Sequence, residues 1–160
     1  MRTIYASLAA ALLLAGCSGG RPVTATTYGP MALLGGYSEK EVEPGLWRVT
    51  GRSNGIAGQG FGRDMAVYRA AELMKARGFS HFQIVDQKGK ITMMGRVGGA
   101  ATNYVGEFLT VTVRGASDPR AALACRAKLA SACGTLSTDE IMGRLGPRLA
   151  FRNSRTASAR

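Results

Sequence analysis

An apolar run near the start of the chain limits what this sequence can form. Residues 4–14 are largely apolar and follow a single positive charge at Arg2. This run of eleven residues is too short to cross the hydrocarbon core of a bilayer, which needs about 20 helical residues. No later stretch of the sequence is long and apolar enough to do so. The run is typical of a secretory signal peptide, so the folded part must come from the residues that follow.

The end of this run carries a more specific signal. Ala15 and Gly16 stand directly before Cys17, and Leu14 lies three positions ahead of that cysteine. The segment Leu14-Ala15-Gly16-Cys17 resembles the lipobox of bacterial lipoproteins. The resemblance implies cleavage before Cys17, a diacylglycerol thioether on its sulfur and acylation of the new amino terminus. Two or more acyl chains hold a protein stably at a membrane. An ordinary signal peptide with an incidental cysteine is the alternative.

The charge of the chain bears on its partners. Lys and Arg number 21 against 10 Asp and Glu, a formal net charge of +11 that falls by one when Arg2 is removed. In a cytosolic protein this excess would suggest nucleic acid as a partner. Export argues against nucleic acid and nucleotides, and favours anionic envelope polymers or another envelope protein. A basic surface that only keeps the protein soluble is the alternative. Ser18 after the cysteine resembles outer-membrane sorting, so we expect a lipid-anchored protein on the periplasmic face of the outer membrane.

Local composition divides the chain into four parts. We expect a signal peptide at 1–16, a flexible tether at 17–36, a single domain at 37–150 and a disordered basic tail at 151–160. The tether, if treated as a flexible coil, has a mean reach of about 25 Å. The arginines of the tail are expected to contact anionic envelope polymers.

Hydrophobic periodicity predicts the elements of the domain. Strands are predicted at residues 46–52, 79–86, 91–94 and 104–114, with a turn at 87–90 between the middle two. Helices are predicted at residues 64–77, 118–133 and 137–146, the second being broken by Gly134. In the first strand, Trp47 and Val49 share one face, whereas Arg48, Thr50 and Arg52 share the other. The pattern indicates a small two-layer α+β domain, with a mainly antiparallel sheet of about four strands and helices mostly on one face.

Several short motifs, taken together, resemble a family of small proteobacterial lipoproteins of unknown function. They are Gly36-Tyr37-Ser38-Glu39, Trp47-Arg48-Val49, Arg69-Ala70-Ala71-Glu72-Leu73 with Gly78-Phe79, and Leu145-Gly146-Pro147-Arg148. The resemblance covers most of residues 36–149 and implies an exported, lipid-anchored protein. It supplies no catalytic residues, and the segment that holds Cys125 and Cys133 does not match it.

Two cysteines remain if Cys17 carries lipid. In an oxidising compartment we expect Cys125 and Cys133 to pair. On one continuous helix their Cα atoms would lie about 12 Å apart, whereas a disulfide needs them within about 7 Å. A disulfide therefore requires the helix to end or bend before Cys133. Two free buried thiols are the alternative.

The sequence indicates no catalytic or metal-binding cluster. His81 is the only histidine, and no spacing supports a zinc site that combines it with the two cysteines. The glycines at positions 58, 60 and 62 precede a helix but lack the Lys-Ser/Thr ending of a phosphate-binding loop. We therefore expect no cofactor and no metal.

The chain is accordingly expected to be a non-enzymatic interaction or sensing module of the cell envelope. The alternative is a small envelope hydrolase or cell-wall-modifying enzyme. Titratable side chains that converge in a cleft around His81, Asp86 or Glu107 would favour the enzyme. A continuous apolar or basic face would favour binding.

Overall fold

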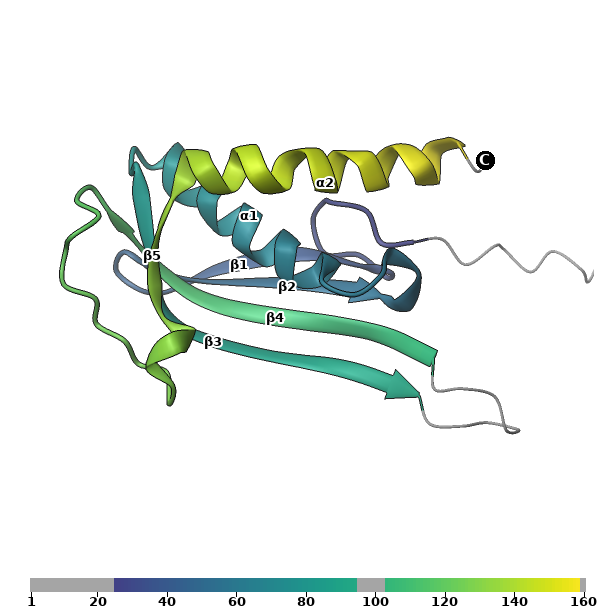
Figure 1. Ribbon diagram of the computed structural model, residues 1–160, viewed down its shortest axis with the longest axis horizontal. Coiled ribbons are helices and arrows are strands. Elements are labelled where there is room, and N and C mark those ends of the chain that lie inside the picture. Colours follow the sequence, from purple (N-terminus) through teal and green to yellow (C-terminus); the bar gives the residue numbers. More distant parts are fainter. Residues whose placement is uncertain (1–24, 95–102, 159–160) are drawn as a thin grey trace, which may run out of the picture.

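The alternating segments form a single antiparallel sheet. The computed structural model describes residues 25–94 and 103–158, and within them the strands are β1 (Gly35–Glu43), β2 (Leu46–Asn54), β3 (His81–Met94), β4 (Asn103–Ala116) and β5 (Gly134–Ser137). Their order across the sheet is β1-β2-β4-β3-β5, with every pair antiparallel. The predicted α+β class is confirmed, with five strands in place of about four (Figure 1).

One side of the sheet is apolar and is covered by helix α1 (Phe61–Ala76). Val49 in β2 lies opposite Val111 in β4, and both side chains are fully buried beneath α1. Gly51 lets the helix approach the sheet closely, because a Cβ atom there would lie 2.2 Å from the carbonyl oxygen of Gly62. The short 3-10 helix η1 (Gly55–Ala57) joins β2 to the segment before α1.

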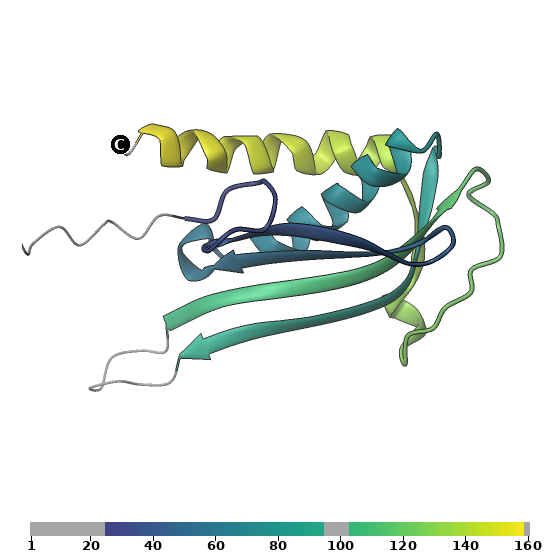
Figure 2. The same ribbon diagram turned by 180° about the vertical axis from the view of Figure 1, so that it is seen from behind.

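Helix α2 (Thr138–Ser158) packs against α1 on the same side of the sheet (Figures 1 and 2). Ile141, Leu145 and Leu149 recur every four residues, and all three are buried. The sequence predicted a helix that ends at residue 146 and a disordered tail from residue 151, whereas α2 continues to Ser158. Pro147 cannot donate to the carbonyl of Gly143, but Gly143 is exposed, so the missing bond does not end the helix.

The predicted turn at residues 87–90 does not form. Residues 81–94 make one long strand, β3, which pairs with β4 along its length. Polar residues are tolerated here because Lys88 and Lys90 project from the uncovered side of the sheet into solvent. Gly89 lies against Leu109, since a Cβ at Gly89 would stand 3.1 Å from the Leu109 side chain.

The predicted helix at residues 118–133 is also absent. Residues 117–133 form a long loop, and the short 3-10 helix η2 (Ala130–Ala132) lies near its end. The helix prediction rested on the apolar periodicity of residues such as Leu123 and Leu129. In the structure these two side chains are 39 % and 70 % exposed, so no core is present for such a helix to face.

The folded part begins earlier than expected. Residues 25–36 were predicted as tether, yet Thr26 is 3 % exposed and its hydroxyl donates to the carbonyl of Leu34. Tyr28 packs against the rings of Tyr37 and Tyr68, and its hydroxyl donates to the carboxylate of Glu72. Burial, reinforced by this hydrogen bond, raises the pKa of Tyr28 above its ordinary range. The remainder of the predicted tether, residues 17–24, lies outside the described residues.

Candidate functional site

Five basic side chains project from the side of the sheet that the helices leave uncovered. We call them the basic face: Lys40, Arg48, Arg52, Lys88 and Lys90. Lys40 lies opposite Arg48, while Arg52 lies opposite Phe108, which in turn lies opposite Lys90. Lys88 lies opposite Thr110, which lies opposite Thr50. Directly opposed residues of antiparallel strands point to the same side, so all five charges share one surface.

The basic face is large enough to meet several anionic groups. The distance from β1 to β3 is three strand spacings, or about 14 Å, and Arg48 and Arg52 lie about 13 Å apart along β2. Between Arg48 and Arg52 lies the uncharged side chain of Thr50, whose hydroxyl is hydrogen-bonded to the hydroxyl of Thr110 at 2.9 Å. A multivalent anion therefore fits this surface better than a single small ion.

Most of these charges are not neutralised by carboxylates. Asp86 shares this side of the sheet, and its Oδ2 atom lies 3.6 Å from Nζ of Lys88. Within the described part of the chain, no carboxylate is within ion-pair distance of Lys40, Arg48, Arg52 or Lys90. These four side chains are exposed and keep their charge toward solvent.

The loop 117–133 covers the other part of the same side of the sheet. Gln83 is 1 % exposed, and its amide donates to the carbonyls of Ala121 at 2.8 Å and Ala122 at 3.3 Å. Its amide oxygen accepts a 2.8 Å bond from Nε of Arg114, whose Nη2 donates to Ala122 as well. Side chains of the sheet thus satisfy loop carbonyls that a helix would otherwise satisfy internally.

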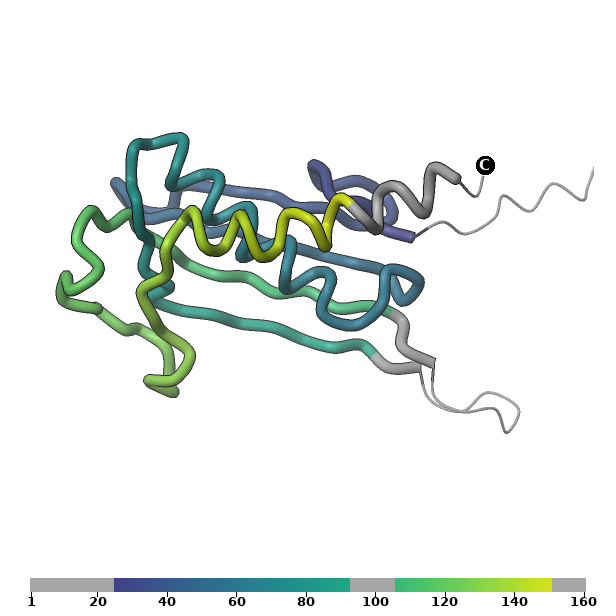
Figure 3. Tube along the Cα trace, turned by 45° about the horizontal axis from the view of Figure 1, so that its top comes forward, coloured from purple at the N-terminus to yellow at the C-terminus, as the bar shows by residue number. Residues whose placement is uncertain are grey.

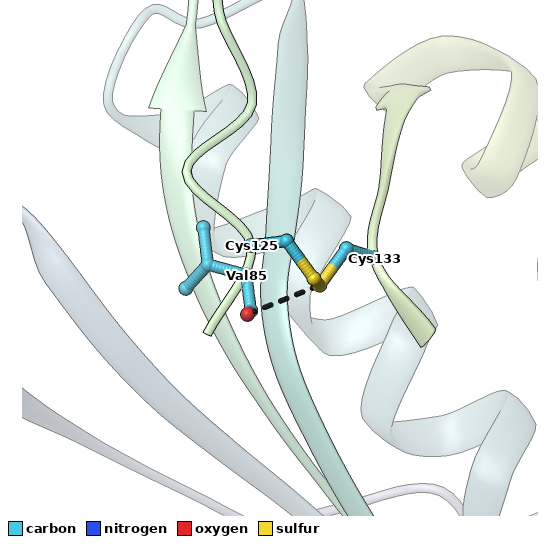
Figure 4. The surroundings of a disulfide bond; sticks show 3 residues. All are labelled: Val85, Cys125 and Cys133. Carbon is cyan, nitrogen blue, oxygen red and sulfur yellow. Dashed lines mark hydrogen bonds between the residues drawn. A yellow bond between two sulfur atoms is a disulfide. The ribbon is translucent and has the colours of Figure 1, made fainter. Parts of the chain in front are cut away.

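The structure joins Cys125 and Cys133 in a disulfide, with Cα atoms 5.7 Å apart (Figure 4). Because the loop is not helical, the geometric objection raised for a continuous helix does not apply. The sulfur of Cys133 lies 3.2 Å from the carbonyl oxygen of Val85, which also accepts a 2.7 Å bond from the backbone N–H of Arg126. The Arg126 guanidinium pairs with Glu43 at 2.8 and 3.1 Å and lowers the pKa of that carboxyl.

The titratable residues considered for catalysis lie apart. His81 begins β3 and bonds through Nδ1 to the hydroxyl of Ser80 at 3.0 Å. Glu107 is buried beside the start of α1, where it accepts from the N–H groups of Gly60 at 3.0 Å and Arg63 at 3.2 Å. Asp86 lies on the uncovered side of the sheet. The structure therefore assigns Glu107 a role in capping α1 and does not bring these three residues together.

Two further points concern the binding of metal and the attachment of lipid. Among the residues that the structure describes, no cluster of three or more His, Cys, Asp or Glu side chains could hold a metal ion. Cys17, the predicted site of lipid attachment, lies outside those residues. In the described ranges, no helix combines the length and apolar character needed to cross a membrane.

Sequence reasoning identified parts of the basic face but did not assemble it. Alternation placed Arg48 and Arg52 on one side of their strand, as the structure confirms. The sequence predicts a turn at Lys88 and Lys90 and predicts no strand at Lys40. The alternation of charged residues at Asp86, Lys88 and Lys90 was the signal that could have indicated a strand.

Comparison with known proteins adds no relative. No protein-family model matches this chain, and no curated protein or solved structure matches it.

Proposed function

We propose that this protein is attached to the bacterial cell envelope by lipid on Cys17 and is a non-enzymatic interaction module that binds an anionic envelope polymer. The proposal is carried by the basic face, where five cations gather on the side of the sheet that neither α1 nor α2 covers. The face has the size and exposure to meet a polyanion. The expected location is the periplasmic face of the outer membrane.

The chemistry of the face favours phosphate and carboxylate groups. Arg48 and Arg52 can each donate two parallel hydrogen bonds to such a group, which lysine cannot do. Lys40, Lys88 and Lys90 add point charges around them. Lipopolysaccharide and cell-wall polymers both carry these anionic groups. Because the charges are exposed, binding should weaken as salt is added.

Binding to purified lipopolysaccharide and to purified cell wall, measured in separate co-sedimentation assays, tests the proposal. We expect the double variant Arg48→Gln with Arg52→Gln to lower affinity for the bound polymer by about tenfold, since exposed charge contacts contribute up to about 1 kcal/mol each. The matched control is Arg120→Gln with Arg144→Gln, which removes the same charge from exposed positions elsewhere. Equal loss in both variants, or no binding to either polymer, would contradict the proposal.

Two further measurements separate parts of the proposal. Mass spectrometry of the protein extracted from membranes should show acyl chains on Cys17, and an unmodified cysteine would contradict the lipid anchor. Deletion of residues 152–160 tests the contribution of the C-terminal arginines. If the deletion abolishes polymer binding while the Arg48 and Arg52 variant retains it, the C-terminal arginines and not the basic face hold the polymer.

A further inference from the structure

The turn before β1 has apolar residues where polar ones are usual. Leu33 and Leu34 are its two central residues, and it is closed by bonds from the Ala32 N–H to Gly35 at 2.8 Å and from the Gly35 N–H to Ala32 at 3.1 Å. Two-residue hairpin turns favour Asn, Asp and Gly at these positions. Leu33 is 96 % exposed, so its apolar side chain is not explained by packing within the protein.

The turn is fixed to the body of the protein. The N–H of Met31 donates to the carbonyl of Tyr37 at 2.7 Å, and the N–H of Tyr37 donates to Gly29 at 2.8 Å. Gly36 passes so close to the turn that a Cβ there would lie 2.4 Å from the carbonyl oxygen of Pro30. The backbone of the turn is therefore already ordered, and binding needs to order only the side chains.

One cation, Arg52, borders the turn, and a second, Lys90, lies two strands farther across the sheet. Met31, Leu33 and Leu34 line one groove together with Arg52 and Phe108. Lys90 lies opposite Phe108 on the neighbouring strand. Exposed apolar side chains beside Lys and Arg are typical of surfaces that enter the headgroup region of an anionic bilayer. The apolar atoms leave water while the cations stay at the level of the headgroups.

The position of the turn agrees with such a contact. The segment 25–34 lies at the end of the molecule where α2 finishes and β3 ends, while the loop 117–133 lies at the opposite end (Figures 1, 2 and 3). The chain from Cys17 to Ala25 spans at most about 29 Å even when fully extended. Helix α2, with 21 residues, is about 31 Å long. A lipid on Cys17 therefore keeps the end of the protein that holds the turn closer to the bilayer than the end that holds the loop 117–133.

We propose that the turn formed by Met31, Leu33 and Leu34 inserts into the surface of an anionic phospholipid bilayer, with Arg52 and Lys90 against the headgroups. The orientation rests on the proposed lipid anchor at Cys17, but the affinity of the turn does not require acyl chains. The contact fixes the orientation of the anchored domain relative to the membrane, with the loop 117–133 directed away from the bilayer.

The test uses the chain from Ser18 onward, which lacks the lipidated cysteine and retains every described residue. Its co-sedimentation is measured with vesicles of phosphatidylethanolamine and phosphatidylglycerol, and with vesicles of phosphatidylcholine alone. We expect stronger binding to the anionic vesicles. Leu33→Asp should lower that binding by about tenfold, because it removes one leucine side chain that the bilayer would bury.

The matched control is Leu129→Asp, which changes an exposed leucine at the far end of the molecule and should leave binding unchanged. Equal binding of the Leu33→Asp variant and the unaltered chain would overturn the proposal, as would the absence of binding to both kinds of vesicle. Arg48→Gln with Lys40→Gln should weaken polymer binding and leave vesicle binding in place. Full polymer binding by this variant would therefore contradict the proposed function, whereas equal vesicle binding of the Leu33→Asp variant and the unaltered chain would contradict the membrane contact.

Discussion

Glu107 is a single residue on which the start of α1 depends. The helix begins after Gly60, which has no side chain to accept the first N–H groups, and Glu107 from β4 supplies the missing carboxylate. A negative charge at this end is also favoured by the helix dipole. From the sequence, Glu107 was one of three residues around which a cleft of titratable side chains would have favoured an enzyme. Its capping role could not be predicted, because it joins residues that are more than 40 positions apart.

We predict that Glu107→Gln lowers the free energy of unfolding by about 1–2 kcal/mol. The variant removes the charge from two hydrogen bonds at a buried helix start. Urea denaturation measures the change. Glu41→Gln is the control, because Glu41 accepts one N–H in an exposed turn and should cost less than about 0.5 kcal/mol. If both variants had the same stability as the unaltered protein, the carboxylate of Glu107 would not be needed at the helix start.

At the scale of elements, the loop 117–133 shows how tertiary contacts override a local pattern. Its alanines and leucines, after Asp118 and Pro119, predict a helix. The structure instead ties the loop to the sheet through Gln83 and Arg126, and a disulfide closes part of the loop. The contacts of Gln83 and Arg126 join residues at least 38 positions apart, so periodicity alone gave no sign of them. The cysteine pair was the one signal in the sequence against a continuous helix, because a helix would hold Cys125 and Cys133 too far apart for a disulfide.

Removal of the disulfide should lower the free energy of unfolding by about 2–3 kcal/mol. The crosslink closes a short loop, which limits the conformations of the unfolded chain. We expect this loss in urea denaturation of the Cys125→Ser with Cys133→Ser variant. The reductant alone should have the same effect on the unaltered protein and none on the variant. Two thiols that react with an alkylating agent before reduction would contradict the disulfide.

At the scale of the whole molecule, the folded domain includes residues 25–36, which precede Tyr37. We predict that a chain starting at Ala25 unfolds at the same urea concentration as the chain from Ser18. A chain starting at Tyr37 should lose about 3–5 kcal/mol, because it leaves the site of the half-buried Tyr28 ring empty and removes the buried Thr26. Equal stability of the two shorter chains would show that residues 25–36 are a tether after all.

The sequence by itself determined the α+β class, the sides to which Arg48 and Val49 point and the presence of α1, since these follow from local periodicity and steric preference. Its expectation of a lipid on Cys17 remains a prediction. Only the tertiary structure decided that β3 is one strand, that residues 117–133 are a loop and that five cations share one surface. Those outcomes depend on which strands become neighbours, because pairing brings together residues far apart in the chain and supplies hydrogen-bond partners that no local pattern contains.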